Sequence, residues 1–84
     1  MSDNNTNDAT PTPDYYISGR KYEPRKVIDD WGLDWELGSA LKYISRAGRK
    51  PGNSALKDLW KAKDFINFEI EKIGSDPNKR PKEV

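Results

Sequence analysis

The sequence contains neither cysteine nor histidine among its 84 residues. The absence of cysteine excludes a disulfide framework and cysteine metal sites, and the absence of histidine removes the commonest zinc ligand and the usual general base. Triad and zinc-hydrolase chemistry are therefore excluded. No apolar run approaches the length needed to cross a bilayer, and no signal-peptide pattern is present, so we expect a cytoplasmic protein that does not enter a membrane.

Hydrophobic residues are also scarce, at 33% of the chain against 35% charged residues. A chain of this length allows one small domain, and a core built from so few apolar residues is thin. We therefore expect a homo-oligomer, in which copies of the chain share apolar surface.

Two polar segments flank the predicted domain. Residues 1–13 are rich in Asn, Asp, Thr and Pro, which predicts a disordered tail, and residues 75–84 carry mixed charge and two prolines, which predicts a flexible one. The domain then spans residues 14–74. It opens with the apolar segment 14–19, which we expect to dock as an extended arm on the chain's own helices or on a neighbouring subunit.

The domain itself is predicted to be all-α, with three helices. The first begins at Pro24 and ends before Gly32, and the second runs over residues 35–47 with Asp34 as its N-cap. The third runs over residues 55–73 after a cap at Ser54.

Apolar residues form a stripe along each of the two longer predicted helices. The stripe of the second helix is the face on which we expect it to pack, whereas the third helix has apolar residues on more than one side and needs a second partner. That partner is expected to be another copy of the chain. The two stripes are Leu37, Ala40, Leu41 and Ile44, and Leu56, Leu59, Ile66, Ile70 and Ile73; the predicted oligomer interface comprises Trp31, Trp35, Trp60, Phe65 and Phe68.

Positive charge is concentrated between residues 42 and 63, where seven basic residues face one acidic residue, Asp58. Such a local excess attracts phosphates, and glycines let backbone N–H groups approach an anion. Three alternatives stay open: the cations solvate helix faces, they complement the C-terminus of a helix at a glycine cap, or Asp58 pairs with a neighbouring cation. The candidate phosphate-binding residues are Lys42, Arg46, Gly48, Arg49, Lys50, Lys57 and Lys61, with Tyr16 and Tyr43 as candidates for base stacking.

Catalysis has less support than binding. The segment 46–52 is not a Walker A loop, because it lacks the Gly-Lys-Ser/Thr ending that holds phosphates and magnesium. The carboxylates Glu36, Asp58, Glu69 and Glu71 are scattered along the sequence, which does not indicate a metal site. We therefore assign no catalytic residue, no metal ligand and no cofactor, with Mg²⁺ expected only if the protein is a kinase.

The sequence contains the blocks Lys21-Tyr22-Glu23-Pro24, Val27-Ile28, Trp31-Gly32-Leu33-Asp34, Leu37-Gly38-Ser39-Ala40-Leu41-Lys42-Tyr43-Ile44, Arg46-Ala47-Gly48-Arg49-Lys50 and Asp58-Leu59-Lys61-Ala62. With these blocks the chain resembles the SaV-like (DUF3310) family of bacteriophage proteins over about residues 14–73. The family usually begins with a His-Tyr pair, and Tyr15-Tyr16 stands in that place here, so no role of that histidine carries over.

The basic cluster, the surplus aromatic side chains and this resemblance together suggest three functions. The resemblance implies a meeting with host defence, because the family's name comes from a phage protein that makes its virus sensitive to a host abortive-infection system. The first is binding or sequestration of a nucleotide or cyclic nucleotide immune signal. The second is a nucleoside monophosphate kinase, or an accessory of phage nucleotide metabolism, because a related domain occurs in the nucleotide kinase of T7-like phages. The third is an interaction module that engages a host defence protein. Duplex nucleic acid is a weaker candidate, because its backbone calls for a broad basic surface, and the residues outside 42–63 carry 13 acidic against 8 basic side chains.

Overall fold

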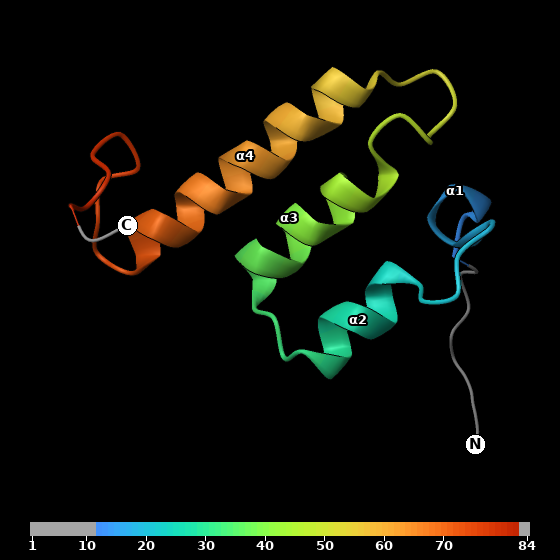
Figure 1. Cartoon of the computed structure of the whole chain (residues 1–84), viewed down its shortest axis with the longest axis horizontal. Helices are drawn as coiled ribbons and strands as arrows, with labels where there is room; N and C mark the ends of the chain where they lie inside the picture. The colour runs from blue at the N-terminus through green and yellow to red at the C-terminus, as the bar shows by residue number, and fades with distance from the viewer. Residues whose placement is uncertain (1–11, 83–84) are drawn as a thin grey trace.

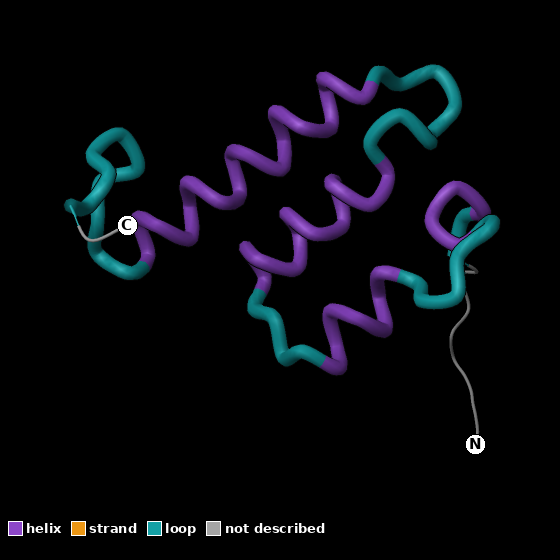
Figure 2. The backbone as a smooth tube through the Cα atoms, in the orientation of Figure 1, coloured by secondary structure: helices purple, strands orange, loops and turns teal. Residues whose placement is uncertain are grey.

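The structure, a computed structural model, describes residues 12–82 of the chain. Four helices make up its regular structure: α1 (Asp14–Ile17), α2 (Pro24–Asp30), α3 (Trp35–Arg46) and α4 (Ala55–Lys72). Loops and turns connect them, and no strand occurs among the described residues (Figure 2). The all-α class is therefore confirmed. None of these helices combines the length and the apolar character that a membrane crossing requires.

Local sequence explains where the three longer helices begin. Pro24 occupies the first turn of α2, where its missing N–H is not needed. The Oδ1 atom of Asp34 accepts a hydrogen bond of 2.9 Å from the Leu37 N–H, and the Oγ atom of Ser54 accepts one of 3.1 Å from the Lys57 N–H. Both predicted N-caps are confirmed, and the predicted helix ends agree with α2, α3 and α4 to within one or two residues.

The segment after the N-terminal tail differs from the prediction. Residues 14–17 form one helical turn rather than an extended arm, because the Ser18 N–H closes on the Asp14 carbonyl at 2.7 Å. The prediction that this segment docks is confirmed within the chain itself, since Tyr16 is buried and α1 contacts α3. The domain thus has a short fourth helix.

Helix α3 is the centre of the arrangement. It lies between α2 and α4, and α3 and α4 run antiparallel as a helical hairpin (Figure 1). Gly38 allows α2 to approach closely, because a Cβ atom at that position would lie 3.0 Å from Cγ2 of Ile28. The molecule is thin, with a shortest axis of 20 Å, and α2, α3 and α4 lie side by side in one layer.

Packing within the chain uses different residues from the predicted stripes. Among residues 12–82, the buried hydrophobic residues are only Tyr16, Ala40 and Ala62. Helix α4 faces α3 with Asp58, Ala62 and Phe65, whereas most of the Leu and Ile side chains of both stripes are exposed; these are Leu37, Ile44, Leu56, Leu59, Ile66 and Ile73. The face on which α3 was expected to pack is therefore largely uncovered.

The C-terminal segment that follows α4 contains turns and no helix over residues 75–82, and it is mostly exposed. The predicted N-terminal tail over residues 1–13 falls almost entirely outside the described residues.

Candidate functional site

A buried ion pair joins the end of α3 to the start of α4. The side chain of Asp58 is fully buried, and its Oδ1 atom accepts hydrogen bonds from Arg46 Nε at 3.0 Å and from Asn53 Nδ2 at 2.8 Å. Its Oδ2 atom is buried without a hydrogen-bond partner among the described residues. The alternative that Asp58 pairs with a neighbouring cation is thus confirmed. Arg46, only 8% exposed, is committed to this pair rather than to a surface anion.

The hydroxyl group of Tyr16, on α1, lies beside the arginine of this ion pair. This hydroxyl group is buried, although no hydrogen bond of normal geometry joins it to another residue of the described chain. Burial raises the pKa of Tyr16, and the neighbouring guanidinium opposes that rise. Burial by itself lowers the pKa of Arg46, but the Tyr16 hydroxyl and the Asp58 carboxylate outweigh it, so that the pKa is raised.

The remaining arginines of this region fasten backbone segments. Arg49 donates a hydrogen bond to the Ser18 carbonyl, and Arg20 donates one of 2.5 Å to the Ser45 carbonyl. These two bonds join the turn after α1 to the C-terminal end of α3, and each of the two segments contributes one arginine donor and one carbonyl acceptor. Gly48, with φ of 76°, turns the chain out of α3 in the left-handed conformation that glycine adopts easily. The loop is therefore held mainly by contacts within the chain.

The cations that stay available gather around Tyr43. The Nζ atoms of Lys42 on α3 and Lys61 on α4 lie 5.4 Å and 5.5 Å from the centroid of its ring, and the Arg46 guanidinium lies 4.6 Å away. No acidic side chain within residues 12–82 forms an ion pair with either lysine. Lys57 is exposed one helical turn before Lys61. Two helices thus present uncompensated charge at one place.

Neither tyrosine predicted to stack on a base offers a free ring face. Tyr16 is buried with its ring centroid 4.7 Å from that of Tyr15. Tyr43 stacks on Phe65, with centroids 5.8 Å apart and planes inclined by 15°, while cations occupy its surroundings. Trp35, which is 73% exposed, presents more accessible aromatic surface than either.

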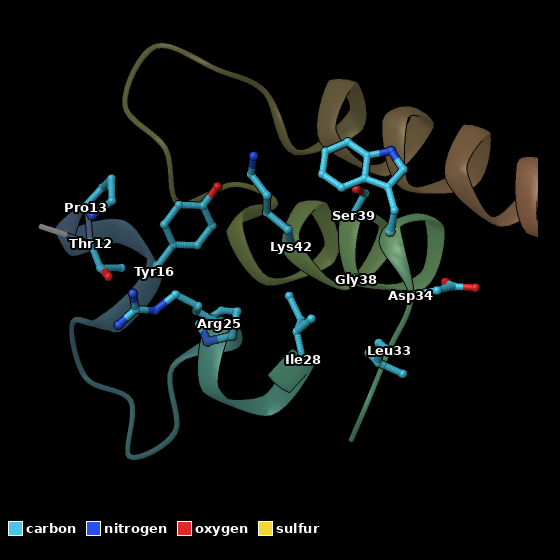
Figure 3. A pocket seen from close by; sticks show the side chains of 12 residues that line it. Thr12, Pro13, Tyr16, Arg25, Ile28, Leu33, Asp34, Gly38, Ser39 and Lys42 are labelled. Carbon is cyan, nitrogen blue, oxygen red and sulfur yellow. The ribbon is translucent and has the colours of Figure 1, made fainter. Parts of the chain in front are cut away.

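A groove of about 530 Å³ lies between α1, α2 and α3 (Figure 3). Its lining is mainly apolar, with Ile28 of α2 and Trp35 of α3 among its side chains and the Ser39 hydroxyl group in its wall. Lys42, one of the two cations beside Tyr43, also lines this groove. An apolar cavity therefore adjoins the cationic cluster.

The residues predicted to form an oligomer interface lie in different surroundings. Phe65 is the centre of an aromatic cluster on the groove side of the hairpin, where it meets Trp35 and Phe68 edge-to-face at 6.1 Å and 5.7 Å. Trp60 packs under the Lys63 ammonium group at 4.4 Å, and Trp31 is exposed at the end of α2. Trp35, Phe65 and Phe68 thus form one cluster, and within residues 12–82 no ring contact joins Trp31 or Trp60 to it.

Three carboxylates meet at the other end of the hairpin. Oxygen atoms of Asp34, Glu36 and Glu69 lie within 4.8 Å of one another, which the sequence spacing did not indicate. Lys72 occupies this position, since its Nζ atom donates to Asp34 at 3.1 Å and to Glu36 at 2.8 Å. The arrangement is therefore an ion-pair network that joins the start of α3 to the end of α4.

This network divides the carboxylates by their pKa values. The hydrogen bond from Lys72 lowers the pKa of Glu36, and the hydrogen bond from the Leu37 backbone, with help from Lys72, lowers that of Asp34. Burial, followed by the hydrogen bond with Asp34, raises the pKa of Glu69, one of whose oxygens has no hydrogen-bond partner in the described chain. Glu69 is thus the carboxyl in this group that binds a proton most readily.

The sequence matches one known protein family. A family model, described as a protein of unknown function (DUF3310), matches residues 11–67, about two thirds of the sequence. The chain belongs to the DUF3310 family. The matched region of this DUF3310 protein includes α1, α2, α3 and most of α4, and therefore the groove and the cluster around Tyr43. No curated protein and no solved structure matches it.

The structure brings together part of the set that the sequence suggested for the DUF3310 protein. Lys42 and Lys61 converge, and Lys57 lies one turn away, whereas Arg46 points inward and Arg49 holds α1. Gly48 and Lys50 belong to the loop. Sequence reasoning named Tyr16 and Lys42 but missed the other residues that line the groove. A signal for the groove exists, because Trp35 and Lys42 are seven residues apart and so share one face of α3.

Proposed function

We propose that this DUF3310 protein binds a nucleotide or a cyclic nucleotide. The convergence of Lys42 and Lys61 from two helices on one aromatic ring supports this proposal most strongly. Both ammonium groups border the same ring, at 5.4 Å and 5.5 Å from its centroid, so one nucleotide bound beside Tyr43 can contact both. Two ammonium groups that no carboxylate of the described chain neutralises favour a phosphate there.

The adjoining groove supports a ligand with a flat apolar part. Lys42 belongs to both the groove and the cationic cluster, so a ligand whose phosphate lies on Lys42 can extend its base along Ile28 and Trp35. Small-ligand sites typically combine an apolar cavity of this size with a few polar groups that fix orientation. A nucleotide has both components, whereas an inorganic anion would use only the lysines.

The biological role that we propose is sequestration. The sequence resembles phage proteins that encounter host defence. A small protein that binds a nucleotide signal lowers the free concentration of that nucleotide without altering the nucleotide chemically. Binding is preferred to phosphoryl transfer, because magnesium-dependent transfer needs accessible carboxylates near the phosphate. Lys72 is bonded to two of the three clustered carboxylates, which lie at the other end of the hairpin from Lys61.

Isothermal titration calorimetry of the full chain against mono-, di- and cyclic nucleotides tests this proposal. We expect at least one to bind, with an affinity that falls as salt is added. Because a charge-assisted hydrogen bond contributes about 1.5–3 kcal/mol, Lys42→Gln and Lys61→Gln should each weaken binding by about tenfold or more.

A matched control is Lys26→Gln, which removes an exposed lysine of α2 that does not line the groove. It should leave the affinity unchanged. Absence of binding across the panel would remove the proposal, and so would binding that is the same in the Lys42→Gln/Lys61→Gln double variant. Formation of a phosphorylated product from ATP and a nucleoside monophosphate would favour the kinase instead.

A further inference from the structure

The chain folds as one layer of helices, so its apolar residues are covered by other helices on one side only. Helices α2, α3 and α4 lie side by side (Figure 1), and within residues 12–82 only Tyr16, Ala40 and Ala62 are buried hydrophobic residues. Stable domains normally place two layers around one core, because each amphipathic helix must bury its apolar stripe. The apolar surface missing from this core must therefore be somewhere on the outside.

That surface is the pair of stripes on α3 and α4. Ile44 on α3 is 49% exposed, and Ile66 and Ile73 on α4 are 41% and 76% exposed. Large aliphatic side chains exposed in a continuous patch mark interaction sites in soluble proteins. We call the following residues the aliphatic face: Leu37, Leu41 and Ile44 on α3, with Leu59, Ile66, Ile70 and Ile73 on α4.

Helix geometry places both stripes on the same side of the hairpin. Each residue advances about 100° around a helix. Tyr43 on α3 and Asp58 on α4 mark the side of each helix that meets the other helix. Viewed along each helix from its N-terminus, the aliphatic stripe is rotated from that side by roughly a quarter turn or more, and in the same direction on both helices. Because the two helices are antiparallel, the same sense of rotation leads to the same side of the layer.

The aliphatic face lies opposite the groove. Ser39 and Lys42 line the groove from α3 (Figure 3). Trp35 lines it too and shares their side of the helix, whereas Leu37 and Ile44 are displaced from these residues by roughly half a turn. One side of the layer is therefore aromatic and cationic, and the other is aliphatic. The two sides can be tested independently.

We infer that the aliphatic face is covered by a second copy of this chain, so that two α3–α4 hairpins stack into a four-helix core. The seven side chains of the face are all aliphatic, with Ala40 between the stripes. Lys63 also lies in the stripe of α4, four residues after Leu59 and three before Ile66, but its ammonium group lies over the Trp60 ring, 4.4 Å from the ring centroid. An occupant must therefore itself offer a largely apolar surface two helices wide. The chain offers that surface. A two-fold arrangement then places each face on an identical one and leaves none uncovered.

The size of the face suits such a dimer. Helix α4 is about 27 Å long and α3 about 18 Å, and two adjacent helices are about 20 Å wide, so each copy offers roughly 450 Å² in projection. Interdigitating side chains bury more accessible area than the projection, which brings two copies to at least about 1,000 Å² in total. That is the lower range of specific interfaces.

Sedimentation equilibrium of the full chain over a range of concentrations tests this inference. We expect a dimer that Ile44→Glu and Ile66→Glu each dissociate, because a carboxylate would be buried in the aliphatic face. The matched control is Trp60→Glu, which introduces the same charge at an exposed aromatic residue outside the face. This control and the Lys42→Gln/Lys61→Gln double variant should remain dimeric.

Thermal unfolding keeps the inference testable if a variant does not fold. The midpoint of a dimer rises with protein concentration, and that of a monomer does not, so the wild-type chain should show a concentration-dependent midpoint. Variants of Ile44 and Ile66 that are monomeric or unfolded, beside a folded dimeric control, support the inference. A wild-type chain that is monomeric throughout, or dimers that Trp60→Glu rather than Ile66→Glu dissociates, would overturn it.

Discussion

At the scale of single residues, Asp58 and Arg46 fix the end of α3 against the start of α4. A carboxylate with no exposed surface is tolerated because Arg46 and Asn53 both donate to its Oδ1 atom. The pair also directs Arg46 inward, which leaves Lys42 and Lys61 as the cations that face solvent near Tyr43. The ion pair therefore shapes the candidate site without belonging to it.

Substitution of Asp58 by Ala should destabilise the fold by about 3 kcal/mol or more, because it leaves the Arg46 guanidinium buried without a counterion. Chemical denaturation monitored by circular dichroism measures this change. Asp64→Ala, at an exposed position of the same helix, is the matched control and should change stability by less than about 0.5 kcal/mol.

A double substitution separates the ion pair from simple loss of packing. Replacing Arg46 by Met in the Asp58→Ala background removes the unpaired charge, so part of the lost stability should return. Equal stability of Asp58→Ala and the wild-type chain would show that the ion pair is not what fixes this junction.

The sequence alone could identify the basic residues of this region, but it could not predict which way their side chains point. The concentration of basic residues between 42 and 63 predicted one anion site that includes Lys42 and Arg46, yet Arg46 pairs with Asp58, which is twelve positions further along the chain. That pairing depends on how α4 folds back after the loop, and no local rule of periodicity fixes the rotation of α4 about its axis. The same rotation decided that Phe65, not a base, would stack on Tyr43.

At the scale of elements, the hairpin is closed at its far end by Lys72. The ionised forms of Asp34 and Glu36 are favoured in the fold, as their lowered pKa values indicate. Their contribution to stability is present above the unfolded pKa values and is lost as the pH falls through the lowered folded values. Glu69 has the opposite sign, because its raised pKa means that stability is lost as the pH rises through it.

Lys72→Gln should therefore reduce the loss of stability on acidification below about pH 5. The effect should come mainly through Glu36, since the backbone hydrogen bond from Leu37 still lowers the pKa of Asp34. Thermal unfolding at a series of pH values measures it, with Lys79→Gln, an exposed lysine beyond α4, as the control. An acid limb that is identical in Lys72→Gln and the wild-type chain would contradict this role.

The elements themselves were predictable because their signals are local. Pro24, Asp34 and Ser54 begin helices through contacts within one turn, and these positions were read directly from the sequence. The one-turn α1 was missed, because its short helix depends on docking against α3 rather than on its own length. The stripes were predicted correctly as apolar, but sequence could not tell whether their partner was in the same chain.

At the scale of the whole molecule, the two sides of the helical layer have different proposed roles. Lys42, Lys61 and the groove form the side proposed for the nucleotide, and the aliphatic face forms the side inferred for the second copy. The division explains why apolar residues and cations are both abundant on α3 without interfering. It also predicts that ligand and self-association are separable properties.

The most direct test of the proposed function is an NMR titration of the labelled full chain with the nucleotide that calorimetry selects. The account predicts that amide and aromatic signals of Trp35, Lys42, Tyr43 and Lys61 shift together and saturate, while those of Leu37 and Ile66 do not move. Shifts confined to Arg49 and Lys50 in the loop, or to the aliphatic face, would contradict it.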